Sequence, residues 1–250
     1  MELTRIRLTL AYDGTEYNGW QLQHEQPTVQ GTLEKAISRI CSCQVRVHGA
    51  GRTDAGTHAL GQVAHFDPPD DKISLPWNKA LNSLLPSSIR VIDLQTVSRD
   101  FHSRFSALSK TYNYTYWTEK LFVYPQRRRY VHKTGPLDIK AMTEAAASLV
   151  GRHDFRAFMN TGSSVNTCTR TVHKVSFSAG LYPQETVLRI SADGFLKQMV
   201  RNIAGTLEVI GRNKYPVHYL DQLMKGKDRT TGPATAPAKG LCLESICYPD

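Results

Sequence analysis

The apolar patterns of strands and helices follow one another along this 250-residue chain in an order that occurs twice. Alternating apolar residues predict strands, and apolar residues spaced by three or four predict helices. In the first half, the expected elements are strands at 8–12, 44–47, 62–66 and 89–97, and helices at 29–40 and 77–85. In the second half, they are strands at 112–116, 171–178, 185–190 and 241–248, and helices at 139–149 and 195–210.

Each half therefore reads β-α-β-β-α-β, which is the order of the ferredoxin-like split βαβ plan. We expect an α+β fold in which two such halves form a continuous, mainly antiparallel sheet, with helices packed on it and a central cleft. The first half would span residues 1–105 and the second 106–250. A sheet of this kind leaves one face open to a partner, so the order of elements already favours a binding function.

The formal charge of +9, from 31 Lys and Arg against 22 Asp and Glu, favours a polyanionic partner such as nucleic acid. The opening residues carry charges within a strand-like pattern, and no apolar run approaches the ~20 residues of a membrane helix. We therefore expect a cytoplasmic protein without a membrane partner. Cys41 and Cys43 lie too close together for a zinc pair, so reduced thiols and no bound metal are expected.

The most informative segment is Gly49–Gly56 (GAGRTDAG), which combines three glycines, an arginine and a carboxylate. It lacks the Gly-Lys-Ser/Thr ending of a Walker A loop, and Asp54 stands where a dinucleotide fingerprint has its third glycine. Two interpretations remain. Asp54 and Gly56 form only a turn between strands, or the loop presents the Asp54 carboxylate to a ligand that approaches the backbone closely.

This segment, together with the following GQVAHF at 61–66, resembles the signature of the tRNA pseudouridine synthase A (TruA) family. The resemblance continues through FHSRFSA at 101–107, KTYNY at 110–114, FLKQMVRNIAG at 195–205 and APAKGLCL at 236–243. It covers nearly the whole chain. Thr57 is a departure, because the family usually has valine there, and residues 119–170 align only in general pattern.

The resemblance implies an enzyme that isomerises uridine in tRNA without a cofactor or metal. Asp54 would be the catalytic carboxylate, although its role at the sugar carbon or at uracil C6 stays open. Tyr112 would stack on the uracil and help to remove the C5 proton, and Arg201 would form an ion pair with Asp54. The family further implies the anticodon arm, at uridines 38, 39 and 40, as substrate and a homodimer as the active form.

Substrate-binding residues are expected among the exposed cations. Arg52 would fill the space that a flipped base leaves or hold a phosphate. Lys197 lies four residues before Arg201, on the helix expected at 195–210. The run Arg127, Arg128 and Arg129 is a further set of phosphate contacts. Each of these cations also has a simpler interpretation as a solvated surface charge.

Two other functions fit parts of the sequence. A non-catalytic RNA-binding module would use the same open sheet, aromatic strand and basic surface, but it would have no need of a carboxylate at Asp54. An RNA glycosylase or nuclease would use that carboxylate to release uracil or to cleave the strand.

Overall fold

The computed structural model describes residues 3–160, 162 and 165–249, which form two compact units. The first unit ends at Leu108 and also contains the chain from Leu243 onwards, and the second spans Ser109–Cys242. The expected halves were divided at 105/106. The last strand, β10 (Leu241–Cys247), begins in the second unit and continues in the first.

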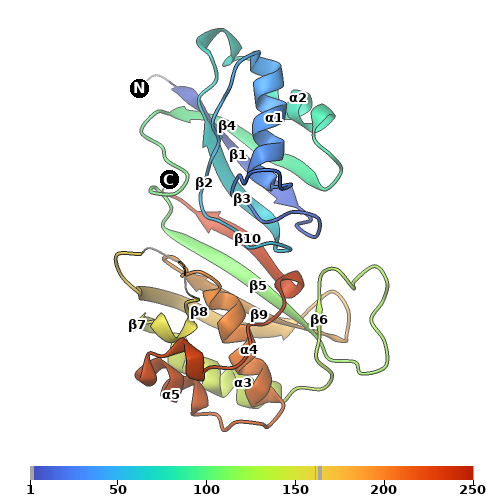
Figure 1. Ribbon diagram of the computed structural model, residues 1–250, viewed down its shortest axis with the longest axis vertical. Coiled ribbons are helices and arrows are strands. Elements are labelled where there is room, and N and C mark those ends of the chain that lie inside the picture. Colours follow the sequence, from blue (N-terminus) through green and yellow to red (C-terminus); the bar gives the residue numbers. More distant parts are fainter. Residues whose placement is uncertain (1–2, 161, 163–164, 250) are drawn as a thin grey trace. The chain divides into compact units, whose positions relative to one another are not determined.

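In the first unit, β4, β1, β3 and β2 pair in that order, each antiparallel to its neighbour, and the last strand of the chain, β10, also pairs with β3. This is the strand order of a split βαβ fold, with two helices on one face of the sheet (Figure 1). The elements in chain order are β1 (Leu3–Tyr12), α1 (Val29–Cys41), β2 (His48–Gly49), β3 (His58–Phe66), α2 (Trp77–Leu84) and β4 (Ile89–Ser98).

Side chains alternate across the two faces of this sheet. Ile6 lies opposite Phe66 in the register, and the Phe66 ring packs edge to face against Trp77 of α2 with 4.9 Å between centroids. Arg7 lies opposite His65, so these two side chains point to the other face. The helices therefore cover the apolar face, and the face of Arg7 and His65 is left to other parts of the unit.

The prediction of a strand at 44–47 is wrong. These residues pair with no strand that the structure describes, and only the following His48 and Gly49 pair with β3, as β2. Side chains of α1 take the place of strand partners. Ser38 Oγ accepts from the Val45 N–H at 3.1 Å, and Glu34 Oε1 accepts from the Val47 N–H at 3.0 Å. Backbone groups that are satisfied by a helix need no neighbouring strand.

In the second unit, the strands pair in the antiparallel order β5-β9-β8-β7, and β6 pairs in parallel with β5. The elements are β5 (Ser109–Trp117), β6 (His132–Lys133), α3 (Ile139–Ala146), β7 (Gly151–Asp154), β8 (Thr169–Ala179), β9 (Glu185–Ala192), α4 (Met199–Gly211) and α5 (Tyr219–Gly226). The expected elements are present, whereas β6, β7 and α5 were not foreseen. Asp138 caps α3 as expected, accepting from the Ala141 N–H.

The helix expected at 195–210 begins only at Met199. Gln198 has a left-handed backbone with φ of 62°, which separates Phe195 and Lys197 from the helix. The apolar spacing continues because the Phe195 ring packs edge to face on Tyr112, with 5.1 Å between centroids. Lys197 and Arg201 are therefore not neighbours on one helix, and that part of the sequence prediction is corrected.

Both units combine helices with mainly antiparallel strands, which confirms the expected α+β class. The expected cleft between the halves stays a prediction. Within the described ranges, no helix has both the length and the apolar character needed to cross a bilayer.

Candidate active site

Asp54 sits on a tight turn in the first unit. The Thr57 N–H donates to the Asp54 carbonyl at 3.1 Å, and Gly56 has φ of 75°. A positive φ at the third residue is what a type II turn requires, and glycine adopts it without strain. The Asp54 side chain is half-buried at this turn. The turn thus holds the backbone around the carboxylate in one conformation.

The segment between β1 and α1 clamps this turn. The Trp20 N–H donates to the Thr53 carbonyl at 3.1 Å, and the Gly56 N–H donates to the Tyr17 carbonyl at 3.2 Å. Gly19 lies so close that a Cβ atom there would come within 2.4 Å of the Thr53 carbonyl oxygen. Residues on both sides of Asp54 are therefore fixed by a second stretch of chain.

Two side chains next to the turn are buried and differ in their partners. The Thr53 hydroxyl and the Tyr12 hydroxyl are 2.8 Å apart and form a buried hydrogen bond. The Thr57 residue is 1% exposed, and its hydroxyl has no hydrogen-bond partner among the residues that the structure describes. Thr57 is also the position at which the sequence departs from the family pattern. A valine methyl group would avoid the cost of an unsatisfied hydroxyl there.

Arg52 is exposed, two residues before Asp54 on the same loop. The loop runs beside β3 up to this point, because the Ala50 N–H donates to the Val63 carbonyl and Gln62 donates its side-chain amide to the Gly51 carbonyl. The pairing ends where Arg52 begins. Arg52 therefore lies outside the strand pairing, on the loop that carries Asp54, and its contact with RNA stays a prediction.

The other two residues predicted to act in catalysis lie in the second unit. Tyr112 is 7% exposed on β5. The next two tyrosines of the alternating run are core residues, because Tyr114 donates its hydroxyl to the Pro237 carbonyl and Tyr116 donates to the Ala204 carbonyl. Burial raises the pKa of both core hydroxyls, so they remain protonated. Of the three, Tyr112 is the one with an aromatic partner from the 195–198 segment.

Arg201 lies in the first turns of α4 and is fixed through Ala236. Its Nε donates to the Ala236 carbonyl at 2.8 Å, and the Ala236 N–H donates to the Arg201 carbonyl at 3.2 Å. This pair of bonds ties the guanidinium to the segment before β10. The expected ion pair with Asp54 stays a prediction.

Sequence reasoning missed the polar network that supports this segment. Asn202, which is 2% exposed, donates to the Phe158 carbonyl at 2.7 Å. Its amide oxygen accepts from Arg229 at 3.0 Å and from the Thr235 hydroxyl at 2.7 Å. A buried amide on the core side of an amphipathic helix needs such partners. The one signal in the sequence was that Asn202 is a polar residue among the apolar positions of α4.

The three consecutive arginines differ in their surroundings. Arg127 Nε donates to Glu185 at 2.6 Å, and the Glu185 side chain is 1% exposed. A buried carboxylate requires such a partner, so Arg127 has a structural role, and the phosphate contact expected of it is left to experiment. Arg128 and Arg129 are exposed. Lys197 is exposed as well, and its backbone carbonyl accepts from the Asn160 N–H.

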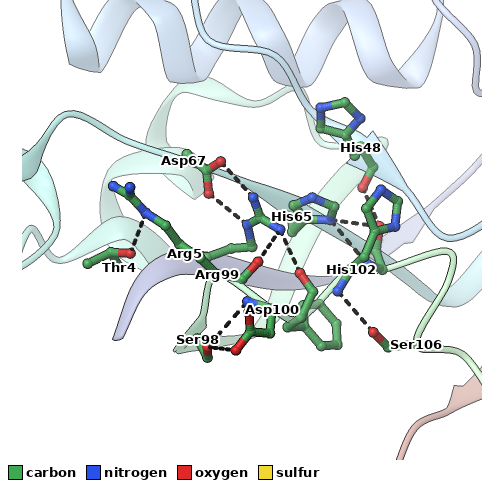
Figure 2. A network of polar contacts seen from close by, with 12 residues as sticks. Thr4, Arg5, His48, His65, Asp67, Ser98, Arg99, Asp100, His102 and Ser106 are labelled. Carbon is green, nitrogen blue, oxygen red and sulfur yellow. Dashed lines mark hydrogen bonds and ion pairs between the residues drawn. The ribbon is translucent and has the colours of Figure 1, made fainter. Parts of the chain in front are cut away.

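A histidine cluster, made of His48, His65 and His102, lies on the face of the first sheet that the helices leave uncovered (Figure 2). The Ser103 N–H donates to His65 Nδ1 at 3.1 Å, which requires a neutral ring with its proton on Nε2. Burial, assisted by the charge of Arg5, lowers the pKa of His65 to about 3. Among the described residues, no group of three or more histidine, cysteine or acidic side chains is arranged to hold a metal ion.

Thr57→Val is expected to raise the free energy of unfolding by about 1 kcal/mol, because it removes an unsatisfied buried hydroxyl. Urea unfolding measures the change. The matched control is Thr53→Val, which breaks the bond to Tyr12 and is expected to lower the same quantity by about 1 kcal/mol. Equal destabilisation by both substitutions would mean that the Thr57 hydroxyl has a partner.

His65 is expected to make stability depend on pH. The unfolded chain takes up a proton at this ring near pH 6.5, whereas the folded chain does so only near pH 3. The neutral His65 ring therefore contributes fully to the free energy of unfolding above pH 6.5, and this contribution is lost as the pH falls towards 3. Between pH 6.5 and 4.5, the native protein should lose on the order of 2 kcal/mol more than His65→Asn, which keeps an acceptor but does not titrate. Urea unfolding at both pH values measures these losses. An equal loss of unfolding free energy in the native protein and in His65→Asn would contradict the prediction.

Comparisons with known proteins identify the family. The model of the tRNA pseudouridine synthase family matches residues 9–106 and 145–249. A tRNA pseudouridine synthase A of Maridesulfovibrio salexigens is 52% identical over 98% of this chain and 91% of that protein. Those of Solidesulfovibrio magneticus and Oleidesulfovibrio alaskensis are 50% and 44% identical, over 98% and 99% of this chain and 92% and 98% of theirs. The chain therefore belongs to the tRNA pseudouridine synthase family, whose members are isomerases that convert uridine to pseudouridine.

Proposed function

We propose that this enzyme acts on uridines 38, 39 and 40 of the tRNA anticodon stem-loop, with Asp54 as its catalytic carboxylate and without a cofactor. The observation that carries the proposal is the clamped turn. A half-buried carboxylate on a turn whose backbone is fixed by Trp20 and Tyr17 is reachable, and its backbone is held in one conformation. Catalytic groups need this preorganisation, because a displacement of about 1 Å costs large factors in rate.

The reaction requires no net oxidation or reduction. The N1–C1′ bond breaks, the uracil turns, C5 bonds to C1′, and the proton on C5 leaves. Asp54 would stabilise the positive charge at C1′, attack that carbon, remove a ribose proton or add to uracil C6. The detached base must stay in the site, so water has to be excluded while the intermediate exists.

Two residues of the second unit would assist Asp54. Tyr112 would stack on the uracil and take part in removal of the C5 proton. Its ring is braced edge to face by Phe195, which supports a defined orientation. Arg201 would keep Asp54 ionised by lowering its pKa. The bond from Arg201 Nε to Ala236 supports this role, because it orients the guanidinium.

Contacts with the tRNA phosphates would come from exposed cations. Arg52 lies next to the catalytic turn, while Lys197, Arg128 and Arg129 are exposed on the second unit. The charge of +9 supports binding to a polyanion. We further propose that the enzyme works as a cytoplasmic homodimer, which sedimentation of the free protein would test.

Asp54→Asn should abolish isomerisation and leave tRNA affinity within about tenfold, because phosphate contacts supply most of the binding free energy. The assay uses a tRNA transcript tritiated at uracil C5, since the label is released only when C5 bonds to C1′. Asp93→Asn is the matched control, because Asp93 is exposed on β4.

Normal tritium release by Asp54→Asn would remove Asp54 from the mechanism. Two other results would overturn the proposed reaction for the unaltered protein. Binding of the transcript without release would indicate an RNA-binding module. Free uracil or a cleaved strand would indicate a glycosylase or a nuclease.

Substitutions in the run Arg127–Arg129 should have two different effects, one on tRNA binding and one on stability. Replacing both Arg128 and Arg129 by Glu should weaken tRNA binding and reduce the slope of log K against log salt by up to about 2. Arg127→Ala should keep that slope but lower the free energy of unfolding by roughly 2 kcal/mol, because Glu185 is left buried without its partner. Binding titrations at several salt concentrations and urea unfolding measure the two quantities. An unchanged slope for the double variant would exclude the run from the RNA contact.

A further inference from the structure

The face of the first sheet opposite the helices carries a row of rings that the proposed mechanism does not use. The segment 99–106 crosses this face and is pinned to it (Figure 2). Arg5 donates to the Arg99 and Phe101 carbonyls at 2.9 and 2.7 Å, and it also pairs with Asp67 at 2.7 Å. The Ser103 hydroxyl donates to the His48 carbonyl at 2.7 Å. The segment is thus a fixed part of the sheet surface.

The rings run from the interior to the solvent. His65 is 1% exposed and stacks on His48 with 5.1 Å between centroids. His102 meets the edge of His65 at 4.7 Å, and Phe105 lies 4.3 Å beyond His102. Phe105 is 77% exposed. The row therefore ends in a large apolar ring that faces water.

Phe105 is held in place, unlike an isolated surface residue. The Phe105 N–H donates to His102 Nδ1 at 3.3 Å, and the Arg104 N–H donates to the same atom at 3.1 Å. A ring nitrogen that accepts two N–H groups carries no proton, and burial lowers the pKa of His102. Phe105 thus stands on a neutral, ordered support, which lowers the entropic cost of binding a ligand to it.

A positive charge, that of Arg104, lies close to the exposed Phe105 ring. The guanidinium carbon of Arg104 lies 5.6 Å from the Phe105 centroid, and Arg104 is exposed. An aromatic face beside a cation matches a nucleotide, which has a base to stack and a phosphate to pair. Single-stranded RNA is recognised in this way, because unpaired bases can leave their stack and lie on aromatic side chains.

The row also lies within reach of an RNA seated at the catalytic turn. His48 precedes Asp54 by six residues, and residues 48–51 run along β3. An extended chain of that length spans at most about 20 Å. The His48 and His102 ring centroids are 5.9 Å apart and Phe105 lies 4.3 Å beyond His102, so Phe105 is on the order of 30 Å at most from the turn. One tRNA arm could therefore contact both places.

We propose that Phe105, supported by His102 and flanked by Arg104, is a stacking platform for an unpaired base of the tRNA. The inference rests on the proposed function, since it takes tRNA as the ligand, but it assigns a binding site separate from the Asp54 turn. The base would lie on the exposed face of Phe105, and Arg104 would neutralise the adjoining phosphate.

Binding of a fluorescent tRNA transcript to Phe105→Ala is the first test. Affinity should fall by about 5- to 150-fold, the range found for loss of one base-aromatic stack. The salt slope should not change, because no phosphate contact is lost. Phe105→Trp should restore affinity to within about twofold, since it offers a larger aromatic face. Arg104→Ala should reduce the slope by about one.

Two controls isolate the stacking contact. Ile92→Ala removes another exposed apolar side chain, 54% exposed on β4, and should leave binding unchanged. A blunt RNA duplex without unpaired nucleotides should bind equally to the unaltered protein and to Phe105→Ala. The proposal would be overturned if Phe105→Ala bound the transcript as tightly as the unaltered protein does. It would also be overturned if Phe105→Ala lost as much affinity for the duplex as for the transcript.

The same variants distinguish this proposal from the proposed function. Tritium release by the unaltered protein together with unchanged transcript binding by Phe105→Ala would reject the platform alone. No release, together with a transcript-specific loss in Phe105→Ala, would reject the reaction and keep the platform. A change in sedimentation of Phe105→Ala without RNA would overturn the platform in favour of a protein contact.

Discussion

The antiparallel pairing of β3 with β1 on one side and β2 on the other is the constraint on which the first unit depends. It fixes which side chains face the helices and which face the opposite side. It also carries the chain from His48 along β3 to the point where pairing ends and the Asp54 turn begins. A shift of one residue in this register would exchange the two faces and bury Arg7 under the helices.

The catalytic turn depends on a second stretch of chain as much as on its own sequence. Glycines within the turn allow its shape, but the bonds from Trp20 and to Tyr17 select that shape from the many that glycines permit. The candidate site in the second unit is built in a comparable manner. Arg201 is oriented through Ala236, and the segment around Ala236 is held by the buried amide of Asn202.

Local signals predicted most of the fold. Thr28 and Asp138 cap α1 and α3 as their residue types suggest, and the strand patterns are found on β1, β3, β4, β5, β8 and β9. The errors arose where a tertiary contact replaced a local one. Side chains of α1 satisfied the backbone at 44–47, and the ring of Tyr112 accounted for the apolar residue at 195 that had suggested a longer helix.

Taken alone, the sequence determined the order of the longer strands and helices, the α+β class, the family and the candidate residues, because spacing and motif are properties of neighbouring residues. Tertiary structure alone decided what each candidate touches. It assigned Arg127 to Glu185, left Arg128 exposed and gathered His48, His65 and His102 into one row. Burial and partners depend on residues far apart in the chain, and single-sequence patterns carry no record of those distances.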